Sequence, residues 1–159
     1  MASVTVARIT PADRGEWLDL FLQWQRQLSG SLSAETHERT WQMLCDEGSG
    51  LFGLLARRED GASVGFAIAS LIPFAWAGGP ILYLQDLFVT AAARGQGVGS
   101  IMLNAVYALA DEKGTPHVFW LVHEEDSELD RFYTRHHAVR TRYVRYMRQD
   151  WPWFAPGAH

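Results

Sequence analysis

The uncharged run from Ala62 to Gln85 limits the folding of this chain more than any other feature, because it holds no Asp, Glu, Lys or Arg. A helical run of this length could span a bilayer. However, Pro73 and the Gly78-Gly79-Pro80 turn interrupt it, and a proline in a helix interior costs about 3 kcal/mol. We therefore predict two buried strands, Val64–Phe74 and Ile81–Val89, and no membrane span.

Composition places the chain among ordinary globular domains. It has 159 residues, of which 48% are hydrophobic and 20% charged, so we expect one domain over residues 1–159. A net charge of −4 argues against nucleic acid as a partner. The single cysteine, Cys45, excludes an intrachain disulfide and a cysteine-rich metal site, and the N-terminus lacks a signal-peptide pattern. We expect a cytoplasmic protein without a bound metal.

Apolar spacing and turn residues predict the other elements. The remaining expected strands are Val4–Ile9, Leu51–Ala56, His117–His123 and Val139–Met147. Helices are expected from Thr10-Pro11 to Gly30, from Ser33 to Gly48, from Gly97 to Lys113 and from Ser127 onward. Ser127 and Asp130 resemble a capping box for the last helix. The order β-α-α-β-β-β-α-β-α-β predicts a mixed α/β domain.

A glycine-rich loop, residues 94–100, joins the strand ending at Val89 to the helix after Gly97. Free N–H groups at such a helix start favour a phosphate, although the glycines alone could simply serve a tight turn. A Walker loop is excluded because the only lysine is Lys113. A Rossmann loop is nearly matched, but too little chain follows for a doubly wound sheet. The pattern Arg-x-x-Gly-x-Gly is fully matched by Arg94, Gly97 and Gly99.

Together, the Leu-x-Asp-Leu-Phe-Val strand, this loop and the segment from Trp120 to Tyr133 resemble the GNAT superfamily of acetyl-CoA-dependent N-acetyltransferases. The likeness is greatest to small bacterial members and looser to polyamine acetyltransferases. It implies a single-domain α/β GNAT fold with a mixed, mostly antiparallel sheet flanked by helices. It also implies direct transfer of an acetyl group from acetyl-CoA to a primary amine of a small molecule or an amino terminus.

The resemblance also implies roles for particular residues. Backbone N–H groups of the loop would hold the pyrophosphate of coenzyme A: Arg94, Gly95, Gln96, Gly97, Val98, Gly99 and Ser100. The pantetheine arm would pair with the end of the strand, at Leu87, Phe88 and Val89, as an added strand. The Val89 N–H, or its neighbour's, would face the thioester oxygen, and Tyr133 would protonate the departing thiolate.

Two positions depart from the family pattern. Gln85 stands where many relatives carry a glutamate base, and an amide cannot take a proton at working pH. The base is therefore open between Asp86, His123 and Glu124, and a catalytically silent acyl-CoA sensor is the alternative function. Asp126 stands where relatives commonly have an asparagine near the pantetheine, so it either contacts the cofactor or caps the helix.

The sequence defines the binding site of the amine acceptor less clearly than that of the cofactor. An acidic cluster would attract a cationic amine or simply cover a solvated face; its members are Glu124, Glu125, Asp126, Glu128 and Asp130. Several aromatic residues would either line a pocket for the amine acceptor or belong to the hydrophobic core: Trp17, Trp24, Trp41, Phe74 and Trp76. The arginines between Arg131 and Arg148, with Trp151, Trp153 and Phe154, would form an exposed face suited to a homodimer.

Overall fold

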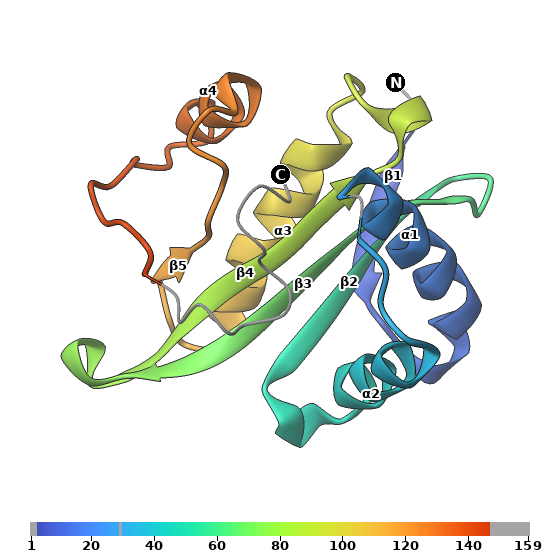
Figure 1. Cartoon of the computed structure of the whole chain (residues 1–159), viewed down its shortest axis with the longest axis horizontal. Helices are drawn as coiled ribbons and strands as arrows, with labels where there is room; N and C mark the ends of the chain where they lie inside the picture. Colours follow the sequence, from blue (N-terminus) through green and yellow to red (C-terminus); the bar gives the residue numbers. More distant parts are fainter. Residues whose placement is uncertain (1–2, 29, 147–159) are drawn as a thin grey trace. The chain divides into compact units, whose positions relative to one another are not determined.

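The computed structural model describes residues 3–28 and 30–146, which fall into two compact units, Met1–Trp120 and Leu121–His159. The first unit holds a five-stranded sheet in the order β1-β2-β3-β4-β5 (Figure 1). Its elements are β1 (Val4–Arg8), η1 (Pro11–Asp13), α1 (Arg14–Gln27), α2 (Ala34–Cys45), η2 (Glu47–Ser49), β2 (Leu51–Arg58), β3 (Ser63–Phe74), η3 (Ala75–Ala77), β4 (Gly79–Val89), η4 (Ala91–Ala93), α3 (Val98–Glu112) and β5 (Val118–Phe119). Strands β1 to β4 run antiparallel, and β5 is parallel to β4.

Helices cover both faces of this sheet (Figure 1). Side chains alternate between faces along a strand, and in β3 they separate two cores. Phe66 and Ile68 pack in one cluster with Trp17 of α1 and Trp41 of α2. A Cβ placed on Gly65 would meet Met102 of α3, so the intervening β3 positions face α3. The mixed, mostly antiparallel architecture expected from the sequence is confirmed.

Local chemistry sets the helix ends. Thr10 donates its backbone N–H to the carboxylate of Asp13 at 2.7 Å, which fixes the turn before α1. The hydroxyl of Ser33 accepts the N–H of Thr36 at 3.1 Å at the start of α2. Gly114, with a φ of 72°, follows the end of α3, where a left-handed residue is commonly required. Each of these boundaries lies within a residue or two of its predicted place.

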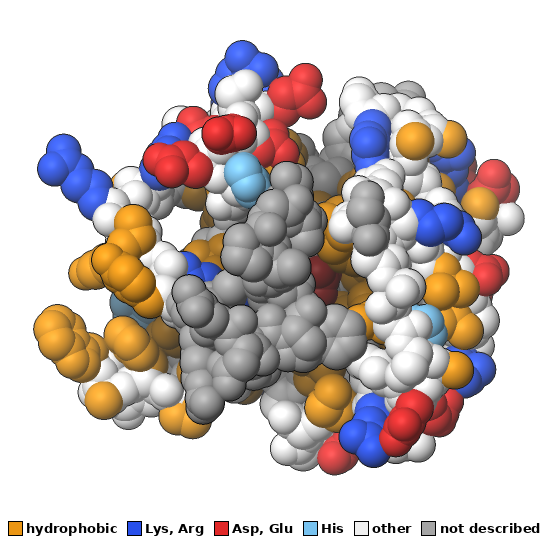
Figure 2. Space-filling model, in the orientation of Figure 1, with side chains coloured by type: hydrophobic (Ala, Val, Ile, Leu, Met, Phe, Trp, Pro, Cys, Tyr) orange, Lys and Arg blue, Asp and Glu red, His pale blue; other side chains and the backbone are white. Residues whose placement is uncertain are grey.

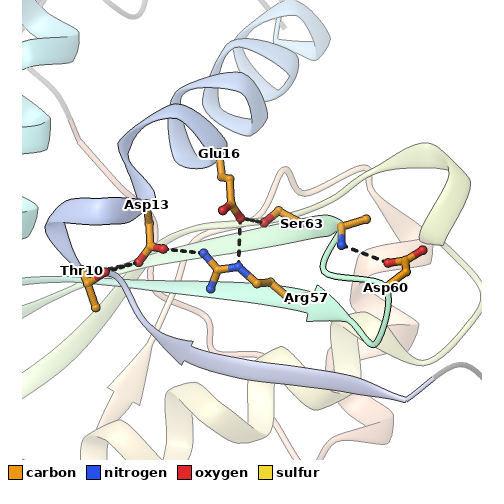
Figure 3. Close-up of polar contacts among 7 residues, drawn as sticks. Thr10, Asp13, Glu16, Arg57, Asp60 and Ser63 are labelled. Atoms are coloured by element: carbon orange, nitrogen blue, oxygen red, sulfur yellow. Dashed lines mark hydrogen bonds and ion pairs between the residues drawn. The ribbon is translucent and has the colours of Figure 1, made fainter.

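An ion-paired cluster ties the start of α1 to the β2–β3 hairpin (Figure 3). Arg57 of β2 lies 2.6 Å from Asp13 and 2.9 Å from Glu16, and Glu16 also accepts a hydrogen bond from the Ser63 hydroxyl. The hydrogen bonds from Ser63 and Arg57 hold the pKa of Glu16 below its ordinary value. At the hairpin turn, Asp60 accepts the N–H of Ala62 at 2.9 Å. The cluster fixes the start of α1 to the hairpin that joins β2 and β3.

The uncharged run forms the β3–β4 hairpin, as predicted. No helix in the described ranges is long and apolar enough to cross a membrane. Figure 2 shows hydrophobic side chains exposed near the hairpin tip, where Trp76 is 94% exposed. The pairing of β3 with β4 is antiparallel and extends to the tip, where Phe74 pairs with Gly79.

Two predicted strands differ in the structure. The strand expected over 117–123 is reduced to Val118–Phe119 and pairs only with Leu82 and Tyr83 of β4. The pairing stops there because a bulge, which bends a strand, follows directly in β4. The strand expected over Val139–Met147 was wrong for residues 139–146, which form no strand; Met147 lies outside the described residues. Tyr143 and Tyr146 are both more than 90% exposed, so no buried face supports a pleated pairing.

In the second unit, helix α4 (Ser127–Arg135) is capped by Asp126, which was one of the two roles expected for that residue, and not by the predicted Ser127 capping box. The Asp126 carboxylate accepts the N–H of Leu129 at 3.0 Å, so Asp126 and not Ser127 is the cap. A carboxylate one residue earlier satisfies a free amide of the first turn and also interacts favourably with the helix dipole. Arg140 lies 3.4 Å from Glu124 and 3.6 Å from Asp130, so part of the acidic cluster is compensated.

Candidate active site

The candidate site lies at the end of β4, where the strand has a partner on one side only. Residues 84 and 86–89 pair with β3, while β5 reaches no further along β4 than Tyr83. Within the described residues, no strand occupies the other edge of β4 from Leu84 to Val89. An extended amide-containing ligand can therefore bind there by adding a strand. The predicted pantetheine contacts Leu87, Phe88 and Val89 all lie on this open stretch.

A β-bulge in β4 decides which side chains face which core. Leu84 pairs with Ala69 and Asp86 with the next residue of β3, Ile68, which leaves Gln85 without a partner. Ile68 belongs to the core shared with α1 and α2, so Asp86 lies on that face. Without the extra residue, strict alternation would keep Asp86 on the same face as Leu84.

Beyond β4, the described loop residues 95–100 leave their backbone N–H groups available, whereas the Arg94 N–H, also predicted to hold the pyrophosphate, is already bonded. Gly95 and Gly97 have φ values of 73° and 82°, a left-handed region that suits glycine. In the described part of the chain, the Arg94 N–H donates to Ala91, but the N–H groups of residues 95–100 donate to no carbonyl. The first amide of α3 with a backbone acceptor is that of Ile101, bonded to Gly97 at 3.1 Å. Such a row of free amides at a helix start fits a diphosphate.

Two arginines border this loop. Arg94 donates to the Val89 carbonyl at 3.1 Å and to the Gln27 side chain of α1 at 2.9 Å. Arg58, at the end of β2, donates to the Gln96 side chain at 3.1 Å, and its buried Nε has no partner among the described residues. In the described residues neither guanidinium is paired with a carboxylate, so both charges favour an anion at the loop. Arg58 could not be predicted as a loop neighbour, because β2 is brought to the loop only by folding.

On the α1 face of β4, the Asp86 carboxylate accepts the indole N–H of Trp24 at 2.9 Å. Burial raises the pKa of Asp86, and this hydrogen bond opposes the rise only in part. Raising the pKa of a carboxylate brings it nearer to that of a useful base at neutral pH. Of the three predicted base candidates, Asp86 is the one in the same compact unit as the loop and the open strand.

Gln85, the bulged residue, is exposed and donates its side-chain amide to the Ser70 hydroxyl at 2.9 Å. An amide in this place can orient a hydroxyl or a water, but it cannot accept a proton at working pH. The departure from the family pattern therefore affects proton transfer rather than the shape of the strand.

The other predicted site residues lie in the second unit. Tyr133 is on α4, beside Phe132 at 5.0 Å between ring centroids, and His123 and Glu124 precede that helix. Glu124 is engaged by Arg140. Asp126 caps α4, and its contact with the cofactor stays a prediction, as do the roles of Tyr133 and His123.

The aromatic residues that were predicted to line an acceptor pocket or form the core lie in different parts of the structure. Trp17 and Trp41 are buried with ring centroids 5.3 Å apart, so they are core. Trp24 lies at the edge of that core. Phe74 and Trp76 belong to the exposed hairpin tip. Trp151, Trp153, Phe154 and Arg148 lie outside the described residues.

Comparison with known proteins decides the family. A model of the acetyltransferase (GNAT) family matches residues 16–138. The chain belongs to the GNAT family. It is similar to D-amino-acid N-acetyltransferase HPA3 of Saccharomyces cerevisiae, with 32% identity over 93% of this chain and 92% of that protein. It is therefore an acetyl-CoA-dependent N-acetyltransferase, and its second substrate is an amine.

Solved structures of GNAT proteins share the fold. An aminoglycoside acetyltransferase, meta-AAC0020 from an uncultured soil metagenomic sample, has a TM-score of 0.78 at 19% identity, covering 91% of this chain and 95% of that one. AAC(6')-Iy in complex with a CoA-containing bisubstrate analogue has a TM-score of 0.78 at 20% identity, covering 92% and 98%. The open edge of β4 and the free loop amides fit acetyl-CoA as the co-substrate. In the described residues, no three His, Cys, Asp or Glu side chains gather as around a metal.

Proposed function

We propose that this GNAT acetyltransferase acts on a primary amine of a small molecule, and that the α-amino group of a free amino acid is the first acceptor to test. The relative HPA3 is named for D-amino acids and matches nearly the whole chain, which supports a small acceptor. The observation that carries the proposal is the open β4 edge leading into a loop with free amides between Arg58 and Arg94.

In the proposed reaction the neutral amine attacks the thioester carbonyl carbon. A C–N bond forms, the C–S bond breaks, and the electron pair of that bond leaves with sulfur. The amides of residues 95–100 hold the diphosphate, and the edge of β4 at Leu87 to Val89 aligns the pantetheine arm. A backbone N–H at the end of β4 stabilises the developing negative oxygen. Tyr133 supplies the proton that the thiolate takes.

Two measurements test this proposal. Calorimetry with acetyl-CoA should show binding at submillimolar ligand, and absence of binding would refute the cofactor site. Thiol release should then be measured with D- and L-amino acids, a polyamine and an aminoglycoside. We expect the highest kcat/KM with an amino acid; a higher value for the polyamine or aminoglycoside would overturn the proposed acceptor class.

Gln85 favours a second candidate, a protein that binds acyl-CoA as a sensor or scaffold without turnover. A sensor would show the calorimetric signal but liberate no free coenzyme A with any amine in the panel. The two candidates are separated by that single result.

We also propose a cytoplasmic homodimer. The support is the absence of disulfide chemistry in a chain whose one cysteine is free, and the arginine-rich stretch that follows α4. Light scattering during gel filtration measures the assembly, and a monomer mass across the working concentration range would contradict it.

A further inference from the structure

Trp24 and Asp86 are 62 residues apart in sequence, and folding joins them through one hydrogen bond on the α1 face of β4. The Trp24 ring also packs on Phe88, with centroids 5.8 Å apart. In the described part of the chain no other side chain donates to the Asp86 carboxylate. Both residues are only partly buried, so the second carboxylate oxygen is left for solvent or a substrate.

Among the residues that the structure describes, no charged neighbour compensates Asp86. Strand β3, which pairs with β4 here, contains no titratable residue. The other titratable or charged side chains on the packed elements are Arg14, Glu16, Asp19 and Arg26 of α1, Glu35, His37, Glu38, Arg39 and Cys45 of α2, Tyr83 of β4 and Arg94 of the loop. His37 bonds to Gln25 at 2.9 Å, Tyr83 stacks on Phe119, and Asp19 and Arg26 are exposed. None of these groups forms an ion pair or hydrogen bond with Asp86.

We propose that Asp86 is the base that takes the proton of the incoming ammonium group, and that Trp24 is the positioning residue that holds its carboxylate through the indole N–H. This inference rests on the acetyltransferase function proposed above. Asp86 lies three residues before Val89, roughly 10 Å along the strand. The substrate amine and one bridging water span that distance.

The proton balance is complete with these groups. The Asp86 carboxylate takes one proton from the substrate ammonium and later releases it to solvent. The neutral amine forms the C–N bond, and the second nitrogen proton passes to solvent as the amide forms. The departing thiolate takes one proton, so the products are the N-acetylated amine and free coenzyme A. Gln85, beside the base, cannot exchange a proton and is left to orient water.

The indole N–H stabilises the ionised carboxylate, so its removal should raise the pKa of Asp86 further. Trp24→Phe keeps an aromatic ring and removes this donor. We expect the acidic limb of the kcat/KM profile to shift to higher pH by about one unit. Trp17→Phe is the matched control, because Trp17 lies on the same helix, is buried, and has an indole nitrogen without a partner in the described part of the chain. It should lower Tm without moving the limb.

The proposal is overturned if Trp24→Phe and Trp17→Phe have the same acidic limb. Asp86→Asn provides a second test that does not depend on the ring, since the amide oxygen still accepts the Trp24 N–H. It should abolish the limb and lower kcat/KM by roughly 10²–10⁴-fold, and a limb that persists in this variant would also refute the proposal.

A readout without turnover separates this inference from the proposed function. NMR titration of the Asp86 carboxyl carbon in the free protein should show a higher midpoint in Trp24→Phe than in Trp17→Phe. Equal midpoints would overturn the positioning role even in an active enzyme. If the wild-type protein binds acetyl-CoA but acetylates no amine, the proposed function fails first, and the base assignment fails with it.

Discussion

Gly65 of β3 lies close to the main chain of β4 on one side and to Met102 of α3 on the other. A Cβ at this position would be 2.6 Å from the carbonyl oxygen of Phe88 and 2.8 Å from the Met102 sulfur. Its backbone does not have positive φ, so the constraint is space rather than conformation. The Phe88 carbonyl is part of the main chain of β4 and cannot rotate away, and Met102 is fully buried. Gly65→Ala must therefore displace the strand.

We expect Gly65→Ala to cost about 1–3 kcal/mol of unfolding free energy, the usual range for overpacking a core. For a chain of this size each kcal/mol lowers Tm by roughly 2–4 °C, so a fall on the order of 2–12 °C should appear in a thermal melt. Because the displaced segment is the edge on which the pantetheine is proposed to pair, KM for acetyl-CoA should also rise.

Gly79→Ala is the control. Gly79 is also in a strand, has no positive φ, and would place its Cβ in open space. It should melt within about 1 °C of the wild-type protein, since surface changes are usually nearly neutral. Gly65→Ala could instead have the same Tm and the same KM for acetyl-CoA as Gly79→Ala. In that case β4 does not approach β3 as described, and the expected crowding at Gly65 is refuted.

Three other changes have clear expected outcomes. Tyr133→Phe should lower kcat by roughly 10²–10⁴-fold with acetyl-CoA affinity kept, as thiol release and calorimetry would show; unchanged turnover would exclude the phenol as the acid. Asp86→Asn should raise Tm at pH 7, because the raised pKa of Asp86 means that its ionised form destabilises the fold; the gain should vanish at pH values where the wild-type carboxyl is protonated in both states. Ser63→Ala should move the pKa of Glu16 back toward its ordinary value. Glu16 stabilises the fold only while ionised, so acid unfolding should begin at higher pH in this variant; an unchanged acid midpoint would contradict the Ser63 contact.

Much of the fold could be predicted because its signals are local. The uncharged run with its central turn indicated the β3–β4 hairpin, and Ser33 and Gly114 marked helix ends through hydrogen bonds and φ requirements that act over a few residues. The glycines of residues 94–100 indicated a loop with left-handed backbone for the same reason, as the positive φ values of Gly95 and Gly97 show. The family pattern then supplied functional roles that spacing alone left open.

Other features could not be predicted because they depend on which strands meet. The length of β5 depends on where β4 bends, and the stretch at 139–146 alternates in sequence but buries no face. Arg58 reaches the loop from β2, and no local pattern distinguishes it from its neighbour Arg57, which instead pairs with Asp13. Because neighbouring side chains of a strand point to opposite faces of the sheet, Arg57 and Arg58 point in opposite directions. The register of the sheet then decides which residues each arginine contacts.

The amino-acid order by itself determined a chain that turns at Gly78, opens a glycine loop after β4 and starts a helix there, because those residues restrict their own backbone. It did not determine the environment of Asp86. One extra residue at Gln85 turns Asp86 toward α1, where burial raises its pKa and Trp24 donates to it. Register and burial are properties of the assembled sheet, so only the tertiary structure could place this carboxylate beside its donor.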